Sequence, residues 1–513
     1  MNSSKINTNG KEDKNDFITP NEQTYAPVLI IGTGIGGLTA AYYLSKNNID
    51  YIITTQGKVP KNSNTYISNA NTRVPEEAKK KEFIELTIEK CGANRSIIET
   101  IYNNSDLVKT FYQEINIPVK KTVFGVMPLS SKKSHGGKII VDSLLKKIRN
   151  PLCNYYLISL ERKDHYIHAL FYDTQTDKFK SIISNYLIIA TGGYGSLFSN
   201  NDNANSATGE ALILAKNIGA NLKGMSTVMF HPWSIYKGKQ ILVGEIVSLC
   251  GGKVVTDNNI EIFQDEKIQR QIANNDYHES FKEILEAEFK VLKEKRNLYL
   301  DLSNISESSL KEKLREHGFS PNTVIDNKIK VGPTIHYTSG GIEVNTLGRS
   351  IEVENLYVIG EAQFDGNIGV GRMPGQPLAS AIVFSYIVAN QISKERNFIF
   401  PNRNIYFTTP TFIKGVYSPH LNSNVLDEEL KQLGNILMDI VSSNQSSINL
   451  LELKEKIIHR QENILRNLRG KGNIFKNIIK LYRGYDIANE IILDKLRKER
   501  NEDTLVLPAY TAK

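Results

Sequence analysis

Cysteine is scarce in this chain, and none of its cysteines forms a CxxC pair. The 513 residues hold three, Cys91, Cys153 and Cys250. Their spacing argues against a disulfide framework and against a structural zinc site, and it fits a reducing cytoplasm. No run of about 20 apolar residues occurs, so we expect no membrane span. The first 23 residues are polar and have no apolar core of the kind that marks a secretory signal.

The net charge of the chain is also small. Lysine and arginine number 63 against 55 aspartates and glutamates, which gives a net charge of +8. Spread over this length, that charge slightly favours anionic ligands but does not indicate a nucleic-acid partner. The polar segment 1–24 is predicted to be a disordered tail.

Ordered structure is predicted to begin with a strand, a glycine turn and a helix. The apolar run 26–31 leads into Gly32–Gly37, which reads G-x-G-x-x-G, and a helix and a second strand at Tyr51–Thr55 follow. In such a turn the first glycine permits the tight bend, the second lets the backbone approach a pyrophosphate, and the third lets the helix pack. This β-α-β unit predicts a dinucleotide site.

The end of the second strand carries no carboxylate, because it reads Thr54-Thr55-Gln56. An acidic residue there commonly holds the ribose of NAD. Its absence weakens an NAD hypothesis, and we expect Thr55 or Gln56 to contact the adenosine side.

Two later strand ends complete a pattern. The strand-like segment 181–189 ends in Ala190–Gly193, and Leu356–Ile359 runs into Gly360-Glu361. With the glycine turn far upstream, the second of these looks like the flavin-contacting strand of two-segment FAD domains. Glu361 is then the natural acceptor for ribityl or ribose hydroxyls.

The fold class predicted is α/β. We expect a Rossmann-like two-segment FAD-binding domain with an inserted α+β capping domain and a C-terminal helical bundle. The expected boundaries are 1–24 for the tail, 25–224 and 335–400 for the FAD-binding domain, 225–334 for the capping domain, 401–424 for a linker and 425–513 for the helical domain.

Seven strings of the sequence, in collinear order, resemble the fumarate reductase, succinate dehydrogenase and L-aspartate oxidase flavoprotein family. The C-terminal helices make the chain most similar to L-aspartate oxidase. The strings are Gly32–Gly37, Ala190–Gly193, Ser206–Ala215, Phe230–Pro232, His336–Gly341, Gly360-Glu361 and Gly371–Met373.

The resemblance implies FAD and a small carboxylate substrate, with a hydride moving between a substrate carbon and flavin N5. His336 and Arg372 match positions that hold one carboxylate, His231 matches one that holds the other end, and Glu245 is retained as a fourth catalytic residue. FAD is expected to be non-covalent, because the stretch 64–68 lacks the attaching histidine of succinate dehydrogenases. The expected cofactor-binding residues are Gly32, Gly34, Ile35, Gly36, Gly37, Thr55, Gln56, Gly136, Gly137, Ala190, Thr191, Gly192, Glu210, Gly360, Glu361, Leu378 and Ala379.

The chain departs from this family in its capping segment. Asn275 stands where the family has an arginine that shuttles the substrate proton, with Arg270 and His278 as loose substitutes. A threonine that would help hold a carboxylate is missing near Glu245. Making or reducing a C=C bond needs a positioned acid or base, whereas oxidising an amine does not need that group. The departures therefore favour amine oxidation over succinate–fumarate chemistry.

Four hypotheses follow for function. The leading one is an FAD-dependent oxidase or dehydrogenase of a small carboxylate, possibly an amino acid, which passes electrons to oxygen or another soluble acceptor. The second is a C=C reductase or desaturase, fumarate reductase-like or ketosteroid dehydrogenase-like, with a relocated proton shuttle. The third is an FAD-binding structural or regulatory protein that has lost catalysis. A nicotinamide-dependent enzyme is the weakest, because no second G-x-G-x-x-G is present.

Overall fold

A computed structural model describes most of the chain. The described residues are 22–61, 63–122, 125–130, 135–237, 239–242, 252–273, 280–303, 306, 308, 328–364, 373–400, 413, 416–417, 425–442 and 446–500.

The central sheet has the order β2-β1-β8-β7-β6, and β16 also pairs with β8. Strands β2, β1, β8 and β16 run parallel, while β7 and β6 are antiparallel additions. The strands are β1 (Glu22–Ile31), β2 (Tyr51–Thr54), β6 (Tyr155–Lys163), β7 (Tyr166–Asp173), β8 (Lys178–Ile189) and β16 (Leu356–Val358).

Strand β1 begins earlier than its apolar run. Glu22 pairs with Lys180 of β8, so residues 22–24 belong to the sheet and not to the predicted polar tail. Ladder hydrogen bonds use backbone groups, which every residue except proline supplies, so polar side chains do not prevent the pairing. The apolar part of the strand, Val28–Ile30, is fully buried, as expected for a parallel strand covered on both faces.

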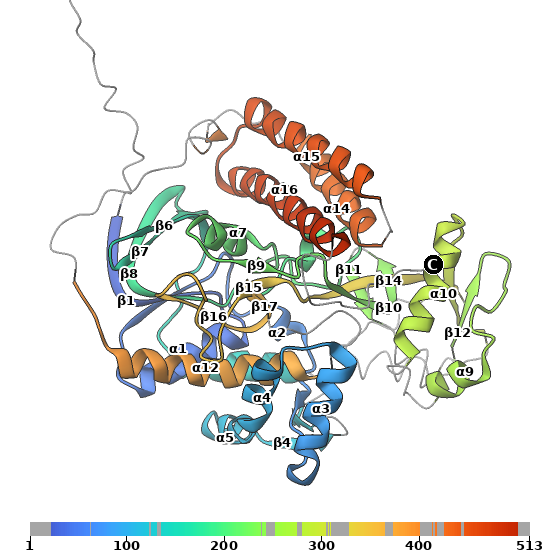
Figure 1. Cartoon of the computed structure of the whole chain (residues 1–513), viewed down its shortest axis with the longest axis horizontal. Helices are drawn as coiled ribbons and strands as arrows, with labels where there is room; N and C mark the ends of the chain where they lie inside the picture. Colours follow the sequence, from blue (N-terminus) through green and yellow to red (C-terminus); the bar gives the residue numbers. More distant parts are fainter. Residues whose placement is uncertain are drawn as a thin grey trace, which may run out of the picture.

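Two helices from distant parts of the chain pack together beneath this sheet (Figure 1). They are α1 (Ile35–Lys46) and α12 (Gln376–Glu395). The Ser385 hydroxyl donates to the carbonyl of Gly36 at 2.9 Å, and the Tyr43 and Tyr386 rings meet edge to face. The two predicted FAD segments are thereby joined around the glycine turn.

Smaller elements surround this core. The helices are α2 (Asn64–Ile67), α3 (Lys80–Cys91), α4 (Arg95–Asn103), α5 (Asp106–Glu114), α6 (Gly136–Leu145) and α7 (Glu210–Asn217). The short strands are β3 (Thr72–Arg73), β4 (Val119–Thr122), β5 (Gly125–Pro128), β9 (Leu222–Lys223), β15 (Gly341–Glu343) and β17 (Gln363–Phe364).

A second sheet extends away from the first and builds what we call the cap, residues 228–338 (Figure 1). Its order is β11-β10-β14-β13-β12, and most of its buried apolar side chains form a cluster separate from the main core. The elements are β10 (Val228–Lys237), β11 (Lys239–Leu242), β12 (Lys253–Thr256), α9 (Glu266–Ala273), α10 (Phe281–Lys293), β13 (Leu298–Asp301) and β14 (Lys328–Thr338).

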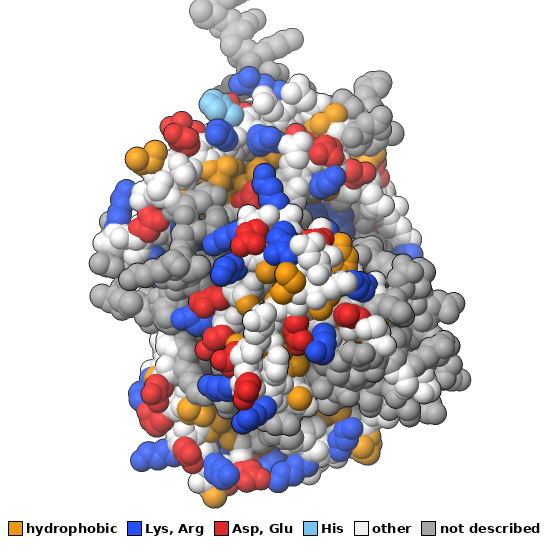
Figure 2. Space-filling view, turned by 90° about the vertical axis from the view of Figure 1, so that its right-hand side faces the viewer, with side chains coloured by type: hydrophobic (Ala, Val, Ile, Leu, Met, Phe, Trp, Pro, Cys, Tyr) orange, Lys and Arg blue, Asp and Glu red, His pale blue; other side chains and the backbone are white. Residues whose placement is uncertain are grey.

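The outer end of the molecule, where the cap lies, mixes charges of both signs. Figure 2 shows basic and acidic side chains interspersed on this face, with single apolar residues between them. That distribution fits the small net charge.

The cap core contains a buried acid. Glu288 on α10 is 0% exposed and lies in the same fully buried layer as Trp233 and Ile284. Burial raises the pKa of its carboxyl well above the usual range, and the nearby Trp233 side chain offsets only part of that effect. Folding of the cap therefore favours the protonated form of Glu288 over the ionised form.

Glu288→Gln is expected to stabilise the cap at neutral pH. The folded pKa of the carboxyl lies above the unfolded one, so folding favours the protonated form, and stability falls as the pH rises above about 4.5. An amide carries no such penalty. We expect a melting temperature higher by about 2–4 °C at pH 7 and no gain at pH 4. The control is Glu283→Gln on the exposed side of α10. A gain that is the same at both pH values would contradict the explanation.

Three helices complete the fold, α14 (Leu426–Ser442), α15 (Ser447–Asn467) and α16 (Gly472–Glu499). They lie on the side of the central sheet that carries α7 (Figure 1). The pair Lys216–Glu490 joins α7 to α16. Among the described residues, no helix is long and apolar enough to cross a membrane.

Candidate functional site

The glycine turn joins β1 to α1 through contacts that exclude larger residues. Gly32 has φ +116°, and a Cβ atom there would lie 2.2 Å from the carbonyl oxygen of Ala190. A Cβ atom on Gly37 would lie 2.0 Å from the carbonyl oxygen of Gly32. These two glycines thus serve the turn and the packing of the helix on the strand, as their spacing predicts.

Gly34 differs from its neighbours because space is open around it. The nearest atom to a Cβ there would be the Thr65 hydroxyl, at 3.5 Å. Gly34 is the N-cap residue of α1 and has no side chain that could cap the helix. The first N–H groups of a helix attract phosphate. The Ile35 N–H already donates to Thr65 Oγ1 at 3.0 Å, so a phosphate would be bound by the N–H groups that follow it. The bare backbone fits the pyrophosphate of a dinucleotide.

The end of β8 brings the later motifs beside this turn. A Cβ atom on Gly193 would lie 1.9 Å from the Thr338 hydroxyl and 2.7 Å from Oε1 of Glu361. Glu361 accepts hydrogen bonds from the backbone N–H and the hydroxyl of Thr338, at 3.0 and 3.1 Å. The buried hydroxyl of Thr191 has no partner among the described residues, so it is available to a cofactor. Gly192 lies beside it with φ +77°.

The N-terminus of α12 closes another side of the site and includes Leu378 and Ala379. The buried side-chain N–H₂ of Gln376 has no partner within the described chain. The segment before this helix is held by Arg73, whose Nε donates to the carbonyl of Pro374 and whose backbone N–H donates to that of Gly375, both at 3.0 Å. A helix N-terminus favours negative charge on a bound ring system.

The adenosine side is expected where β2 ends. Thr55 is buried there, and its carbonyl accepts from Tyr155 at 3.0 Å. Gln56 Nε2 donates to the carbonyl of Ser206 at 2.7 Å, which leaves its own carbonyl oxygen for a ligand. These contacts place the start of β6 and the loop before α7 around the strand end.

Glu210 begins α7 and is buried. The hydroxyls of Tyr156 and Thr208 donate to its two oxygens. Lys476 of α16 lies 5.4 Å from the centre of the Tyr156 ring. Glu210 is thus part of a hydrogen-bonded group in the protein, and its assignment to the cofactor stays a prediction.

Gly136 and Gly137 open α6 and pack against the backbone of α2 and of the residues just after it. Cβ atoms there would lie 2.3 Å from the carbonyl oxygen of Asn69 and 1.8 Å from that of Thr65. Close packing therefore already requires glycine at both positions. Contact with a cofactor stays a prediction.

His231 and His336 come together because the strands that carry them are bulged. Met229 pairs with Tyr337 and Phe230 pairs with Ile335, so His336 is an extra residue on β14. Beyond His231 the register shifts again, near Pro232 and Pro333, which have no N–H for the ladder. Bulges re-aim side chains. The two imidazole rings lie 5.8 Å apart, centre to centre.

Asp202 joins this pair through the loop before α7. The loop lies along β14, where the Ile335 N–H donates to the carbonyl of Asn200 at 2.9 Å. Asp202 Oδ2 then lies 2.7 Å from Nδ1 of His336. The Asp202 side chain is 11% exposed and that of His336 is 33% exposed. The carboxylate therefore orients the ring and leaves Nε2 to face a ligand. His231 is buried, and its Nδ1 accepts from the Trp233 N–H at 3.4 Å.

Several predicted residues lie outside the described residues, namely Glu245, Gly371, Arg372, Asn275 and His278.

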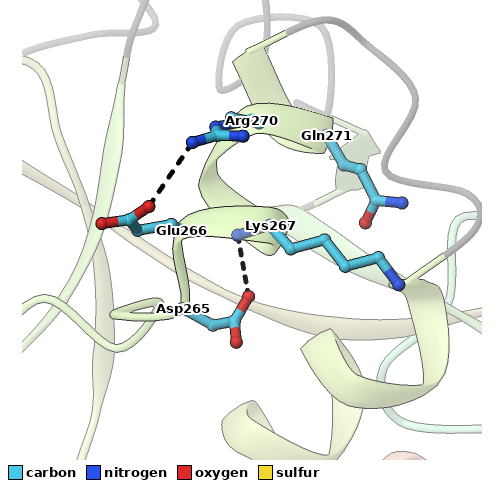
Figure 3. Close-up of a pocket in the computed structure, with 5 residues that line it drawn as sticks. All are labelled: Asp265, Glu266, Lys267, Arg270 and Gln271. Carbon is cyan, nitrogen blue, oxygen red and sulfur yellow. Dashed lines mark hydrogen bonds and ion pairs between the residues drawn. The ribbon is translucent and has the colours of Figure 1, made fainter.

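Arg270, one of the two loose substitutes for the proton shuttle, is described. Its side chain is 79% exposed on α9 and pairs with Glu266 at 3.4 Å. Figure 3 shows it at an open hollow that Asp265, Lys267 and Gln271 also line. Such exposure disfavours Arg270 as a buried proton shuttle.

The geometry and the sequence both indicate a flavin dinucleotide site, and comparison with known proteins agrees. The sequence model of the FAD binding domain family matches residues 27–378, more than half of the chain. The chain belongs to this family. It is therefore an FAD-binding oxidoreductase, and the predicted resemblance to fumarate reductases, succinate dehydrogenases and L-aspartate oxidases is confirmed.

The individual relatives have low sequence identity to this chain, but each match spans most of this chain and most of the relative. The L-aspartate oxidase of Clostridium perfringens is 27% identical over 390 residues, which span 70% of this chain and 85% of the relative. Among solved structures, FrdA of E. coli quinol fumarate reductase has a TM-score of 0.75 at 16% identity, with 93% of this chain and 90% of that one covered. Sdh1 of Mycobacterium smegmatis has a TM-score of 0.71 at 19% identity, with 92% and 86% covered. The two structural likenesses support the predicted α/β fold.

Sequence reasoning missed four residues of the site: Thr65, Arg73, Gly193 and Asp202. Asp202 lies only four residues before the Ser206 string, so its proximity to a motif was a usable signal. Gly193 stood inside the Ala190–Gly193 string, but only the structure shows that Thr338 fills the space beside it. Thr65 lies in the stretch 64–68 that matches the flavin-attachment position of succinate dehydrogenases, but nothing there singled out its hydroxyl. Arg73 lies in a segment without a motif.

Proposed function

We propose that this flavoprotein oxidises a small carboxylate-bearing substrate, with an amino acid as the first choice, and passes the electrons to oxygen or another soluble acceptor. One observation carries the proposal. His231 and His336 face each other from two bulged strands at the junction between the FAD-binding part and the cap. Bound FAD would supply the hydride acceptor.

The protein residues have distinct tasks in this proposal. His336 is oriented by Asp202, which accepts from its Nδ1–H, and in the imidazolium form it donates from Nε2 toward one substrate carboxylate, together with Arg372. His231 donates toward the other end of the substrate from the cap side. The site holds the substrate in one orientation, which supports hydride transfer from a fixed carbon.

An amino acid is favoured over a saturated dicarboxylate for a chemical reason. Forming a C=C bond removes a proton from the carbon next to the hydride donor, and a base must be placed there. Asn275 replaces the family arginine at that position. Oxidation of a neutral amine needs no such base, because the nitrogen lone pair assists loss of the hydride. The relatives named L-aspartate oxidase support the same choice.

The test is anaerobic bleaching of the bound flavin. Purified FAD-loaded protein is mixed with L-aspartate, other amino acids or succinate, and the flavin absorbance is followed before and after air is admitted. We expect an amino acid to bleach the flavin and air to restore the colour. If no amino acid or dicarboxylate bleaches it, and chemically reduced protein passes electrons to no unsaturated acid, the catalytic proposal is wrong.

A further inference from the structure

The chain crosses between the FAD-binding part and the cap in one place. Ser226 and Thr227 lead into β10, and Thr338 and Ser339 leave β14. The two crossings are joined by the Val228–Thr338 pair and by the Ser339 N–H, which donates to the carbonyl of Thr227 at 3.0 Å. We call residues 225–228 and 337–339 the hinge segment. Any reorientation of the cap has to pass through it.

The last turns of α16 contact the first strand of this hinge segment. Asp494 Oδ2 accepts from the backbone N–H of Ser226 at 2.9 Å and from its hydroxyl at 2.5 Å. Lys498 Nζ lies 2.9 Å from the Ser226 hydroxyl oxygen and 2.9 Å from that of Thr227. Lys498 also pairs with Asp494 at 2.9 Å. Two residues one helical turn apart thus hold two consecutive residues of the hinge.

The contact is buried and specific. The Asp494 side chain is 4% exposed and that of Lys498 is 26% exposed. Burial by itself would raise the pKa of Asp494, but the Lys498 ammonium and the Ser226 donors outweigh it and lower that pKa below the ordinary value. A buried ion pair favours the fold only when its hydrogen bonds are satisfied. Here the hinge supplies those bonds, so α16 and the hinge segment depend on each other.

The flavin side holds the other strand of the hinge. Glu361 accepts from Thr338, and the Tyr194 N–H donates to the Thr338 hydroxyl oxygen at 3.3 Å. The Tyr194 hydroxyl donates to the carbonyl of Met225. The first strand of the hinge, residues 225–228, is therefore held by α16 and by the Tyr194 hydroxyl. The second, residues 337–339, is held by Glu361 and by the Tyr194 N–H. His336 stands two residues before Thr338 on the same strand.

We propose that Asp494 and Lys498 are positioning residues, through which the C-terminal helix sets the orientation of the cap over the FAD-binding part. They touch the hinge and not the substrate. The inference rests on the proposed function only for its kinetic consequence, because the histidines that the hinge carries form the proposed carboxylate site.

Hydrogen exchange on the FAD-loaded full-length protein tests the inference without any substrate. Lys498→Met and Asp494→Asn remove a charged partner from the hinge, and amide exchange is measured in peptides that cover 224–236 and 331–341. The matched control is Lys216→Met, which breaks the pair with Glu490 one turn earlier on α16 and does not touch the hinge. Lys498→Arg keeps the charge.

Exchange in the two hinge peptides is expected to rise on the order of tenfold in Lys498→Met, as loss of a charged hydrogen bond would produce. Lys216→Met should leave these peptides unchanged, and Lys498→Arg should stay close to the parent protein. Equal exchange in Lys498→Met and Lys216→Met, or no change in either, overturns the proposal. Asp494→Asn removes the charge of the buried partner itself, whereas in Lys498→Met the Asp494 carboxylate keeps its two donors on Ser226. Lys498→Met therefore decides the outcome.

Kinetics then separate a positioning role from a merely structural one. If a substrate is found, Lys498→Met should slow flavin reduction at saturating substrate while FAD remains bound, and Lys216→Met should not. If no substrate is found, the proposed function fails, and the exchange result still decides the role of the helix. A faster-exchanging hinge with an unchanged reduction rate would refute the kinetic part.

Discussion

Replacing His336 by alanine is expected to lower the rate of flavin reduction by substrate by a factor on the order of 10² to 10³, while FAD stays bound. The ring occupies the extra position of the β14 bulge and is oriented by Asp202. Removing one preoriented donor from a site that binds charge costs a factor of this size. Stopped-flow reduction measures the rate, and the flavin spectrum of the purified variant reports retention of the cofactor. The sequence predicts the same pattern for Arg372→Ala.

A milder substitution shows whether Asp202 orients the His336 ring or contacts the substrate directly. Asp202→Asn keeps the size of the side chain and one hydrogen bond to His336, so we expect a loss on the order of tenfold, smaller than for His336→Ala. Glu352→Gln, at an exposed position on another loop, is the control. Full activity in His336→Ala would remove this histidine from the site. A larger loss in Asp202→Asn than in His336→Ala would mean that the carboxylate itself contacts the substrate.

The second large effect is expected at the glycine turn, where Gly34→Ala should fold normally and lose FAD. A methyl group at Gly34 meets no atom closer than 3.5 Å, so the fold accommodates it. The same methyl group lies where the backbone must approach the pyrophosphate. We expect the affinity for FAD to fall on the order of 100-fold or more, measured by flavin fluorescence titration of the apoprotein, with unchanged circular dichroism.

Gly32→Ala gives the opposite outcome and serves as the matched comparison. Its methyl group would lie 2.2 Å from the carbonyl oxygen of Ala190, on backbone with φ +116°. Both effects act on the fold, so poor folding or a lower melting temperature is expected. If both variants folded and bound FAD alike, the separate roles assigned to the two glycines would be wrong.

The sequence was most informative where a function depends on the backbone. The turn Gly32–Gly37, the strand ends at Ala190 and Gly360 and the first β-α-β unit follow from local spacing and apolar runs, which fix short-range geometry. The sequence did not show that β1 begins at Glu22, because backbone pairing with β8 does not depend on side-chain polarity. Asp202 and Arg73 were missed because their roles arise only from contacts between distant segments.

The bulge at His336 is a second feature that the sequence alone does not reveal. The sequence string around it identifies a histidine at a family position. Only the register of β10 against β14 shows that His336 is an extra residue in a bulge. Pro232 and Pro333 gave a partial signal, because prolines in neighbouring strands interrupt pairing. The distance between His231 and His336 could not be deduced from their separation of more than a hundred residues.

The pairing of Val228 with Thr338 has a consequence for exchanging caps between related flavoproteins. Because the first and last residues of the cap are neighbours in one ladder, the whole segment between them enters and leaves the FAD-binding part at a single point. An insertion whose ends are adjacent can be exchanged with little disturbance to the surrounding chain. Grafting the corresponding segment of a relative between these two residues would replace the whole cap in one exchange and leave the FAD-binding part unchanged.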